Sequence, residues 1–260
     1  NLANGTSGSG GGIFSTGGSV TVTDAVISQN SANRAGGGIE VIEGSVTLNN
    51  SALSINDVNG TAGTPNPGNG GGMHVSGAAT VSITGGTVSA NEAASEGGGL
   101  WNQAGATMTV TDAMVNINTA AGNDADNGGG GIFNNGGNLG IVNSTVQSNT
   151  ATGTSGSGGG VLTTDGDVTV IGGSIDNNSA NRAGGGVEII DGMLSMANTS
   201  LNSNGVNGSS GAPNPGNGGG LHVSGIANVS MFGGTVSLND AAAEGGGLWN
   251  QAGSTMEVDN

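Results

Sequence analysis

Residues 129–149 read GGGIFNNGGNLGIVNSTVQSN and contain the pattern that decides the fold. A glycine triplet precedes the aliphatic Ile132, an alternating pair, Leu139 and Ile141, comes next, and the segment closes on Val146 and Asn149. The triplet recurs along the 260 residues, beginning at Gly10, Gly36, Gly70, Gly97, Gly129, Gly158, Gly184, Gly218 and Gly245. Self-similarity at such a period is typical of a solenoid, in which each repeat forms one coil.

Each repeat has one part of constant length and one loop of variable length. A recurrent asparagine follows the last glycine of the triplet by 18 or 19 residues, whereas the distance to the next triplet varies widely. Aliphatic residues alternate with Ser or Thr in the constant part, which indicates a strand with one buried face. The abundance of Gly, Ser, Thr and Asn disfavours helix. We therefore predict an all-β, right-handed parallel β-helix of about nine coils, with three short strands per coil.

The recurrent asparagines are expected to stack on one another inside the solenoid. Identical amide side chains at the coil spacing of ~4.8 Å form hydrogen-bonded ladders in stacked β structures. The ladder would consist of Asn30, Asn56, Asn91, Asn118, Asn149, Asn178, Asn204 and Asn239.

A second, longer repeat lies over the first. A shift of 148 residues superimposes Ser31–Gly38 on Ser179–Gly186 and Glu96–Gly105 on Glu244–Gly253. We predict a single continuous solenoid over residues 1–260, made of super-units at about 1–148 and 149–260, the second incomplete. Pro-Asn-Pro-Gly loops ending at Gly68 and Gly216 are expected to project from one edge. Because both ends of the chain fall inside a coil, we expect a slice of a longer array or a unit that stacks end to end.

Composition excludes several classes of partner. The chain has 58 Gly, no Cys, and a formal net charge of −16 from 18 acidic residues and only two basic ones. An acidic surface repels nucleic acid and anionic lipid, so we expect neither as a partner. No apolar run approaches the length needed for direct membrane insertion.

Two segments carry a family resemblance. Gly129 to Asn135 and Val146 to Asn149 resemble the repeats of bacterial right-handed parallel β-helix proteins, in particular the polymorphic outer-membrane-protein or autotransporter-passenger type with Gly-Gly-Ala-Ile and Phe-x-x-Asn motifs. Here Gly replaces Ala, and Val, Ile or Leu replaces Phe in most coils. The resemblance covers essentially the whole chain. It implies a secreted or surface-exposed protein, often an adhesin or fibrous protein.

Candidate catalytic groups are sparse. Enzymes on this fold cluster Asp with Arg or Lys on one face, but this chain has no Lys, and Arg34 and Arg182 occupy equivalent loops about five coils apart. We expect the arginines to pair with nearby acids such as Glu40 and Glu188 or to cap a loop, and we expect no enzyme activity and no required cofactor.

Four aromatic or imidazole side chains also occur in equivalent pairs. His74 and His222 are expected at the surface, too far apart to share a metal ion. Trp101 and Trp249 are each followed by Asn-Gln-Ala-Gly. They form a possible contact surface: an exposed Trp stacks on sugar rings, although packing over a corner is the favoured interpretation.

One variable loop is similar in sequence to a calcium-binding loop. Asn123 to Gly128 place Asp124 and Asp126 in an Asp-x-Asp arrangement, but the distal bidentate Glu of a calcium loop is missing. A solvated polar turn is the favoured interpretation, with calcium binding as the alternative.

The outward residues of the middle strand form rows across the coils. Thr and Ser dominate the first four coils, an array that resembles ice-binding β-helices, and it breaks down in later coils. Val142, Ile171 and Phe232 instead suggest an apolar stripe suited to lateral contact with another rod.

These observations favour a non-enzymatic extracellular structural protein, a segment of a surface fibre or adhesin stalk that self-associates end to end or laterally. The alternative is a glycan- or surface-binding adhesin module that works through the tryptophan corners or the proline loops. Ice binding is the third hypothesis.

Overall fold

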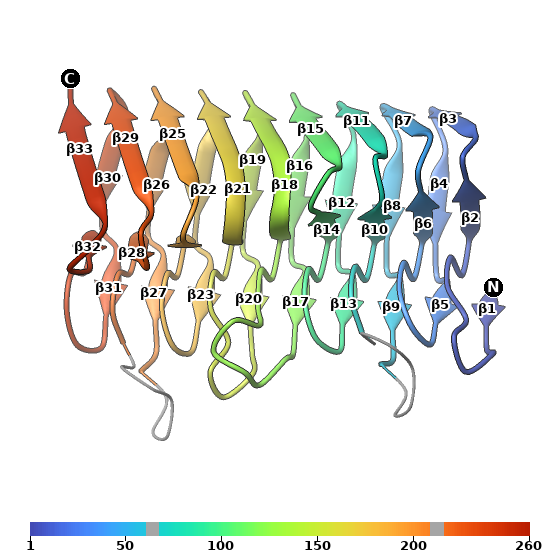
Figure 1. Cartoon of the computed structure of the whole chain (residues 1–260), viewed down its shortest axis with the longest axis horizontal. Coiled ribbons are helices and arrows are strands. Elements are labelled where there is room, and N and C mark those ends of the chain that lie inside the picture. Colours follow the sequence, from blue (N-terminus) through green and yellow to red (C-terminus); the bar gives the residue numbers. More distant parts are fainter. Residues whose placement is uncertain (61–67, 209–215) are drawn as a thin grey trace.

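The computed structural model describes residues 1–60, 68–208 and 216–260. Within these ranges the chain forms strands and no helix, and it winds into a parallel solenoid of about eight turns. The turns follow one another along one axis, so the two ends of the chain lie at opposite ends of the stack (Figure 1). The predicted all-β parallel solenoid is confirmed. The Pro-Asn-Pro segments at 65–67 and 213–215 lie outside the described residues.

Three parallel sheets run along the rod. The first contains nine strands of two residues: β1 (Leu2–Ala3), β5 (Ser31–Ala32), β9 (Asp57–Val58), β13 (Glu92–Ala93), β17 (Thr119–Ala120), β20 (Thr150–Ala151), β23 (Ser179–Ala180), β27 (Gly205–Val206) and β31 (Asp240–Ala241). The second contains sixteen: β2 (Ile13–Thr16), β3 (Ser19–Thr23), β6 (Ile39–Ile42), β7 (Ser45–Asn49), β10 (Met73–Ser76), β11 (Thr80–Thr84), β14 (Leu100–Gln103), β15 (Thr107–Thr111), β18 (Ile132–Val142), β21 (Val161–Ile171), β24 (Val187–Ile190), β25 (Met193–Ala197), β28 (Leu221–Ser224), β29 (Asn228–Phe232), β32 (Leu248–Asn250) and β33 (Thr255–Asp259). The third contains eight: β4 (Val26–Ser28), β8 (Ala52–Ser54), β12 (Thr87–Ser89), β16 (Met114–Asn116), β19 (Thr145–Gln147), β22 (Ser174–Asp176), β26 (Ser200–Asn202) and β30 (Thr235–Ser237).

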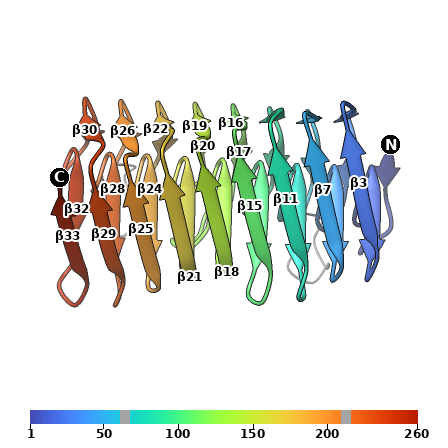
Figure 2. The ribbon, with the colours of Figure 1, turned by 90° about the horizontal axis from the view of Figure 1, so that it is seen from above.

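The second sheet has two strands per turn in most of the rod. A short break divides β2 from β3 and β6 from β7, whereas in β18 and β21 the chain stays extended and each strand is 11 residues long. The predicted three strands per coil therefore correspond to three sheets. In most turns, the segment in the second sheet is divided into two shorter strands. Figure 2 shows β3, β7, β11, β15, β18, β21, β25, β29 and β33 following one another in the same direction.

The core is one continuous cluster of aliphatic side chains, arranged in columns along the rod. Ile39 pairs with Met73, Met73 with Leu100, and Leu100 with Ile132, all fully buried, so each turn lays one inward side chain on the last. Similar columns come from the remaining inward positions of the second and third sheets. Full burial of one such side chain contributes roughly 1.5–3 kcal/mol. Because no turn encloses a core of its own, cohesion depends on stacking.

The glycine triplet is required by the tightness of one corner. Gly129 has a positive φ of 62°, and a Cβ there would lie 2.5 Å from the carbonyl oxygen of Ile132. A Cβ on Gly130 would lie 2.5 Å from the carbonyl oxygen of Thr150, across the same turn, and 2.6 Å from that of Gly159 in the following turn. A Cβ on Gly131 would lie 2.6 Å from the carbonyl oxygen of Gly160 in the next triplet and 3.0 Å from the side chain of the ladder residue Asn149. Any side chain here would therefore push two turns apart.

The asparagines expected to stack do form a buried ladder. The Nδ2 and backbone N–H of Asn118 both donate to Oδ1 of Asn149, at 2.9 and 3.0 Å. Its Nδ2 also donates to the carbonyl oxygen of Val88, at 3.0 Å. The amide-to-amide bond recurs from Asn30 to Asn239, and it crosses the junction between the super-units from Asn149 to Asn178. The ladder thus ties every turn to the next at the same corner.

The residue before each ladder asparagine adopts a left-handed backbone conformation. All eight are non-glycine, with φ between 52° and 58°: Gln29, Ile55, Ala90, Ile117, Ser148, Asn177, Ser203 and Leu238. The conformation is costly for a β-branched residue such as Ile117. The hydrogen bonds made by the next residue compensate for it.

Candidate functional site

A row of outward side chains runs along the second sheet, one residue after each inward aliphatic. The strand register places its nine members above one another: Phe14, Glu40, His74, Trp101, Phe133, Leu162, Glu188, His222 and Trp249. Although these positions face away from the core, the seven members from Glu40 to His222 are all buried, and Glu40, Leu162 and Glu188 have no exposed surface. We call these nine residues the outer row.

Each super-unit places a buried ion-pair cluster in this row. Arg34 Nη2 donates to Glu40 Oε1 at 3.0 Å, and His74 Nδ1 lies 3.0 Å from Glu40 Oε2. Arg34 Nε also donates to the hydroxyl of Ser9 at 2.9 Å. A buried carboxylate is costly unless it is paired and hydrogen-bonded. Three groups from three different turns therefore gather around one carboxylate, in which Arg34 hydrogen-bonds Oε1 while Oε2 and His74 Nδ1 lie close without hydrogen-bond geometry.

The second super-unit repeats the cluster. Arg182 donates to Glu188, and His222 Nδ1 lies 3.2 Å from the same carboxylate. Burial of Glu188 raises its pKa, but the hydrogen bond from His222 and the positive charge of Arg182 outweigh this, and the net pKa of Glu188 is lowered. The pairing of both arginines with Glu40 and Glu188 agrees with the expectation from the sequence.

The expected surface position of the histidines is wrong. His74 and His222 are 5% and 3% exposed. The ring of His74 stacks on Trp101 with centroids 4.2 Å apart, and His222 stacks on Trp249 at 4.4 Å. The next turn covers each imidazole with an indole ring, a contact between residues 27 positions apart that sequence spacing alone does not reveal.

Trp101 is part of the packing and offers no exposed face. It is 5% exposed, with His74 on one side and Phe133 stacked at 6.1 Å on the next turn. Its Nε1 donates to Glu96 Oε2 at 3.0 Å, and Trp249 makes the same bond to Glu244. The idea that Trp101 stacks on a sugar ring is therefore incompatible with its burial. Trp249, in the last turn, is half-buried.

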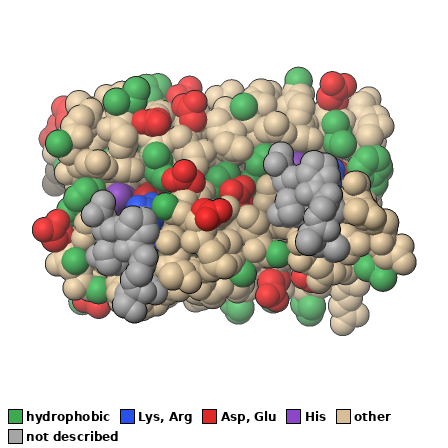
Figure 3. All heavy atoms as spheres, turned by 60° about the horizontal axis from the view of Figure 1, so that its bottom comes forward, with side chains coloured by type: hydrophobic (Ala, Val, Ile, Leu, Met, Phe, Trp, Pro, Cys, Tyr) green, Lys and Arg blue, Asp and Glu red, His purple; other side chains and the backbone are tan. Residues whose placement is uncertain are grey.

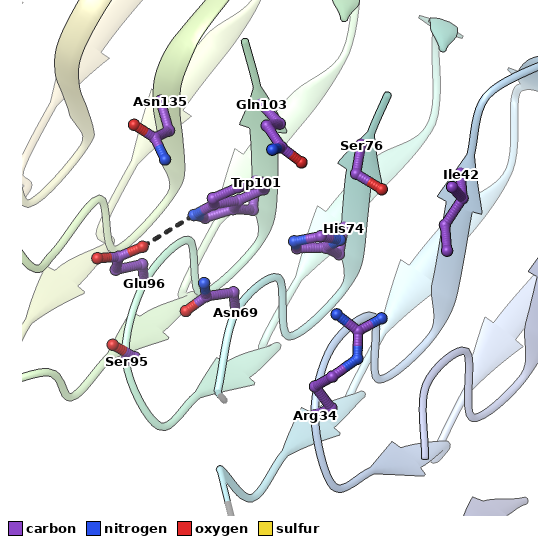
Figure 4. A pocket seen from close by; sticks show the side chains of 10 residues that line it. All are labelled: Arg34, Ile42, Asn69, His74, Ser76, Ser95, Glu96, Trp101, Gln103 and Asn135. Carbon is purple, nitrogen blue, oxygen red and sulfur yellow. Dashed lines mark hydrogen bonds between the residues drawn. The ribbon is translucent and has the colours of Figure 1, made fainter. Parts of the chain in front are cut away.

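A polar pocket of about 400 Å³ opens beside this part of the outer row (Figure 4). Its lining consists of Arg34, Ile42, Asn69, His74, Ser76, Ser95, Glu96, Trp101, Gln103 and Asn135. Figure 4 shows these side chains arranged around one space, with Arg34 at one end and Asn135 at the other. We call this the first pocket.

An equivalent second pocket of about 610 Å³ lies further along the rod. Its lining includes Arg182, Ile190, Asn217, His222, Ser224, Ala243, Glu244, Trp249 and Gln251, each 148 positions beyond a residue of the first pocket. Figure 3 shows Arg and His side chains reaching the surface at two places on one face, with acidic side chains between them. The rod therefore presents the same polar site twice.

Glu96 sits at the edge of the first pocket. Asn127 Nδ2 donates to its Oε1 at 2.7 Å, and Trp101 bonds its Oε2. Burial raises the pKa of Glu96 more than these hydrogen bonds lower it. Neither Glu96 nor Asn69 stands out as a candidate in the sequence; the available signal is that both recur after 148 residues, as Glu244 and Asn217.

The acidic loop forms a polar turn. The backbone N–H of Asp124 donates to Oδ1 of Asn127 at 3.0 Å, and Asp126 reaches the rim of the second pocket. Among residues 1–60, 68–208 and 216–260, no group of three or more His, Cys, Asp or Glu side chains converges on one point. Calcium binding by Asp124 and Asp126 remains a prediction.

The apolar stripe expected on the middle strand lies on adjacent turns. Val142 pairs with Ile171, Ile171 with Ala197, and Ala197 with Phe232. Ile171 and Phe232 are 45% and 53% exposed. Their side chains thus lie on the outer surface of the rod, in one row on the second sheet.

Comparison of the chain with protein families, curated proteins and solved structures finds no match. The fold and the site themselves define the class of protein: a parallel β-solenoid with a polar pocket repeated once per super-unit. Within residues 1–60, 68–208 and 216–260, there is no helix long and apolar enough to cross a membrane.

Proposed function

We propose that this chain is a segment of a rigid extracellular rod, a structural element of a surface fibre or adhesin stalk with no catalytic role of its own. The observation that carries the proposal is the unbroken stacking of turns. The asparagine ladder and the strand register continue across the junction of the super-units, where β18 pairs with β21. A body without a hinge at its internal junction suits a spacer.

The resemblance of the glycine and asparagine motifs to polymorphic outer-membrane-protein or autotransporter-passenger repeats supports an extracellular location. We propose that the chain belongs to this type of repeat protein. A net charge of −16 disfavours adhesion to nucleic acid or anionic lipid, in keeping with a role as a solvated stalk.

Lateral self-association is the second part of the proposal. The exposed row that contains Ile171 and Phe232 lies on the outer surface of the second sheet. Two such rows, packed together, would remove apolar surface from water on both rods.

Electron microscopy of the native material tests the proposal. We expect straight rods with an axial repeat of ~24 Å, since five turns at ~4.8 Å make one super-unit. Bundles of rods that dissociate in the variant Ile171→Glu, Phe232→Glu would support lateral contact. Isolated compact particles, with no rods in the native material, would contradict the proposal.

A further inference from the structure

We propose that the first and second pockets each bind one uncharged saccharide unit. The proposal concerns a site on the rod and does not depend on the rod's role as a spacer. It starts from the fact that the two pockets are lined by nearly the same residues.

The pocket lining is retained between the super-units while other surfaces have changed. Nine residues of the first pocket have a counterpart 148 positions later, and eight are identical, the exception being Ser95, which is replaced by Ala243. In contrast, β7 and β25 are also equivalent, and none of their five positions is identical. Stacking of the turns alone therefore does not require the two super-units to have identical residues at equivalent positions. The retained set includes the half-buried Ile42 and Gln103, which are outside the buried ion-pair cluster.

Each pocket contains a buried polar atom that lacks a partner. Asn69 is 6% exposed and its Oδ1 has no hydrogen bond among the described residues, and the same holds for Asn217, which is 7% exposed. An unsatisfied buried acceptor costs roughly 1–3 kcal/mol. The same unpartnered oxygen occurs at equivalent places in both pockets, and because it has almost no exposed surface, it would accept a hydrogen bond from a donor on a ligand once the asparagine side chain turns toward the pocket. A hydroxyl group is such a donor.

The remaining lining offers both donors and acceptors at close quarters. Arg34 uses Nε and Nη2 within the protein, and no bond from its Nη1 is formed among the described residues. Gln103 makes no side-chain hydrogen bond there, and Glu96 has acceptor capacity beyond its two bonds. Vicinal hydroxyl groups, each both donor and acceptor, fit a mixed set of this kind.

Charge favours an uncharged ligand. Glu40 already pairs with the guanidinium of Arg34, so a bound anion would gain little attraction from Arg34. The same anion would also face the carboxyl group of Glu96. A cation would face Arg34. In the first pocket, because His74 and Phe133 stack on Trp101, a sugar would be held by hydrogen bonds to side-chain groups and would not stack on the indole ring. The volumes of about 400 and 610 Å³ lie within the usual range for small-ligand pockets.

The test uses the full chain and a panel of immobilised oligosaccharides built from glucose, galactose, mannose, N-acetylglucosamine or uronic acids. The best binder is then titrated by calorimetry. We expect binding to an uncharged member with two sites per chain. The variant Gln103→Leu, Gln251→Leu should weaken it at least tenfold, and either single substitution should halve the number of sites.

A matched control is Gln147→Leu on β19, a half-buried glutamine in another sheet, which should leave binding unchanged. A second variant, Asn69→Leu with Asn217→Leu, removes the unpartnered oxygens and should abolish binding without lowering the melting temperature. Binding by no oligosaccharide, binding only to uronic acids, or binding unaffected by both variants would overturn the proposal.

Discussion

His74 Nδ1 lies 3.0 Å from Glu40 Oε2, although the two residues are one full turn apart in the chain. Arg34, from a corner of the earlier turn, holds the other oxygen of the same carboxylate. Stacking thus creates a buried cluster of charged side chains outside the aliphatic core, and the second super-unit contains the same cluster.

Removal of the central carboxylate is expected to destabilise the rod strongly. In Glu40→Gln, Arg34 loses its buried counter-charge and His74 loses the carboxylate beside its Nδ1, and breaking a buried ion pair from one side costs about 3–5 kcal/mol. Urea unfolding followed by circular dichroism measures the loss. Glu43→Gln, on a less buried residue nearby, is the control and should change stability by less than about 0.5 kcal/mol. Equal stability of the two variants would show that the cluster contributes nothing.

Stability should respond to acid through Glu188. Its folded-state pKa is lowered below the ordinary 4.5, so the carboxylate stabilises the fold above pH 4.5 and this contribution is lost as the pH falls through the folded pKa. Thermal melting of the wild type should show this loss at acidic pH, and Glu188→Gln should show a smaller one. An unchanged acid profile in the variant would rule out this role.

Glu96 should have the opposite effect. Burial raises its pKa above 4.5, so stability is greatest below 4.5 and declines as the pH rises through the raised folded pKa. In Glu96→Gln that decline should disappear from the melting profile. Persistence of the decline in the variant would assign it to another group.

The asparagine ladder should be sensitive at a single rung. In Asn149→Ala, the backbone N–H and Nδ2 of Asn118 lose their acceptor. Two unsatisfied buried donors cost roughly 2–6 kcal/mol. Hydrogen exchange at the amide of Asn118 should become faster, while Asn49→Ala, on a half-buried strand position, should leave it unchanged. Equal exchange in both variants would contradict the ladder's role.

Relief of a left-handed isoleucine should stabilise the protein. Ile117 has φ 58° and is 59% exposed, and Asn tolerates this conformation better than a β-branched residue does. Ile117→Asn should raise the unfolding free energy by about 1 kcal/mol. Val26→Asn, at an equally exposed strand position, should give no gain. A similar effect of both substitutions would argue against backbone strain.

The regular features of the molecule are readable in the sequence, whereas the contacts of the outer row are not. Leu139, Ile141 and Asn149 recur at fixed offsets, so their strands and ladder follow from periodicity. His74 carries no such signal, because its neighbours Glu40 and Trp101 come from adjacent turns. Its burial depends on which residues the stacking places above and below it. The pocket is hidden for the same reason, since its lining comes from several turns.

The length of an extended chain tests the rod most directly. A second copy of residues 1–148 inserted between residues 148 and 149 adds five turns, and small-angle X-ray scattering should show a maximum dimension longer by ~24 Å with an unchanged cross-section. An unchanged length, or a wider cross-section with two bodies side by side, would contradict a continuous solenoid.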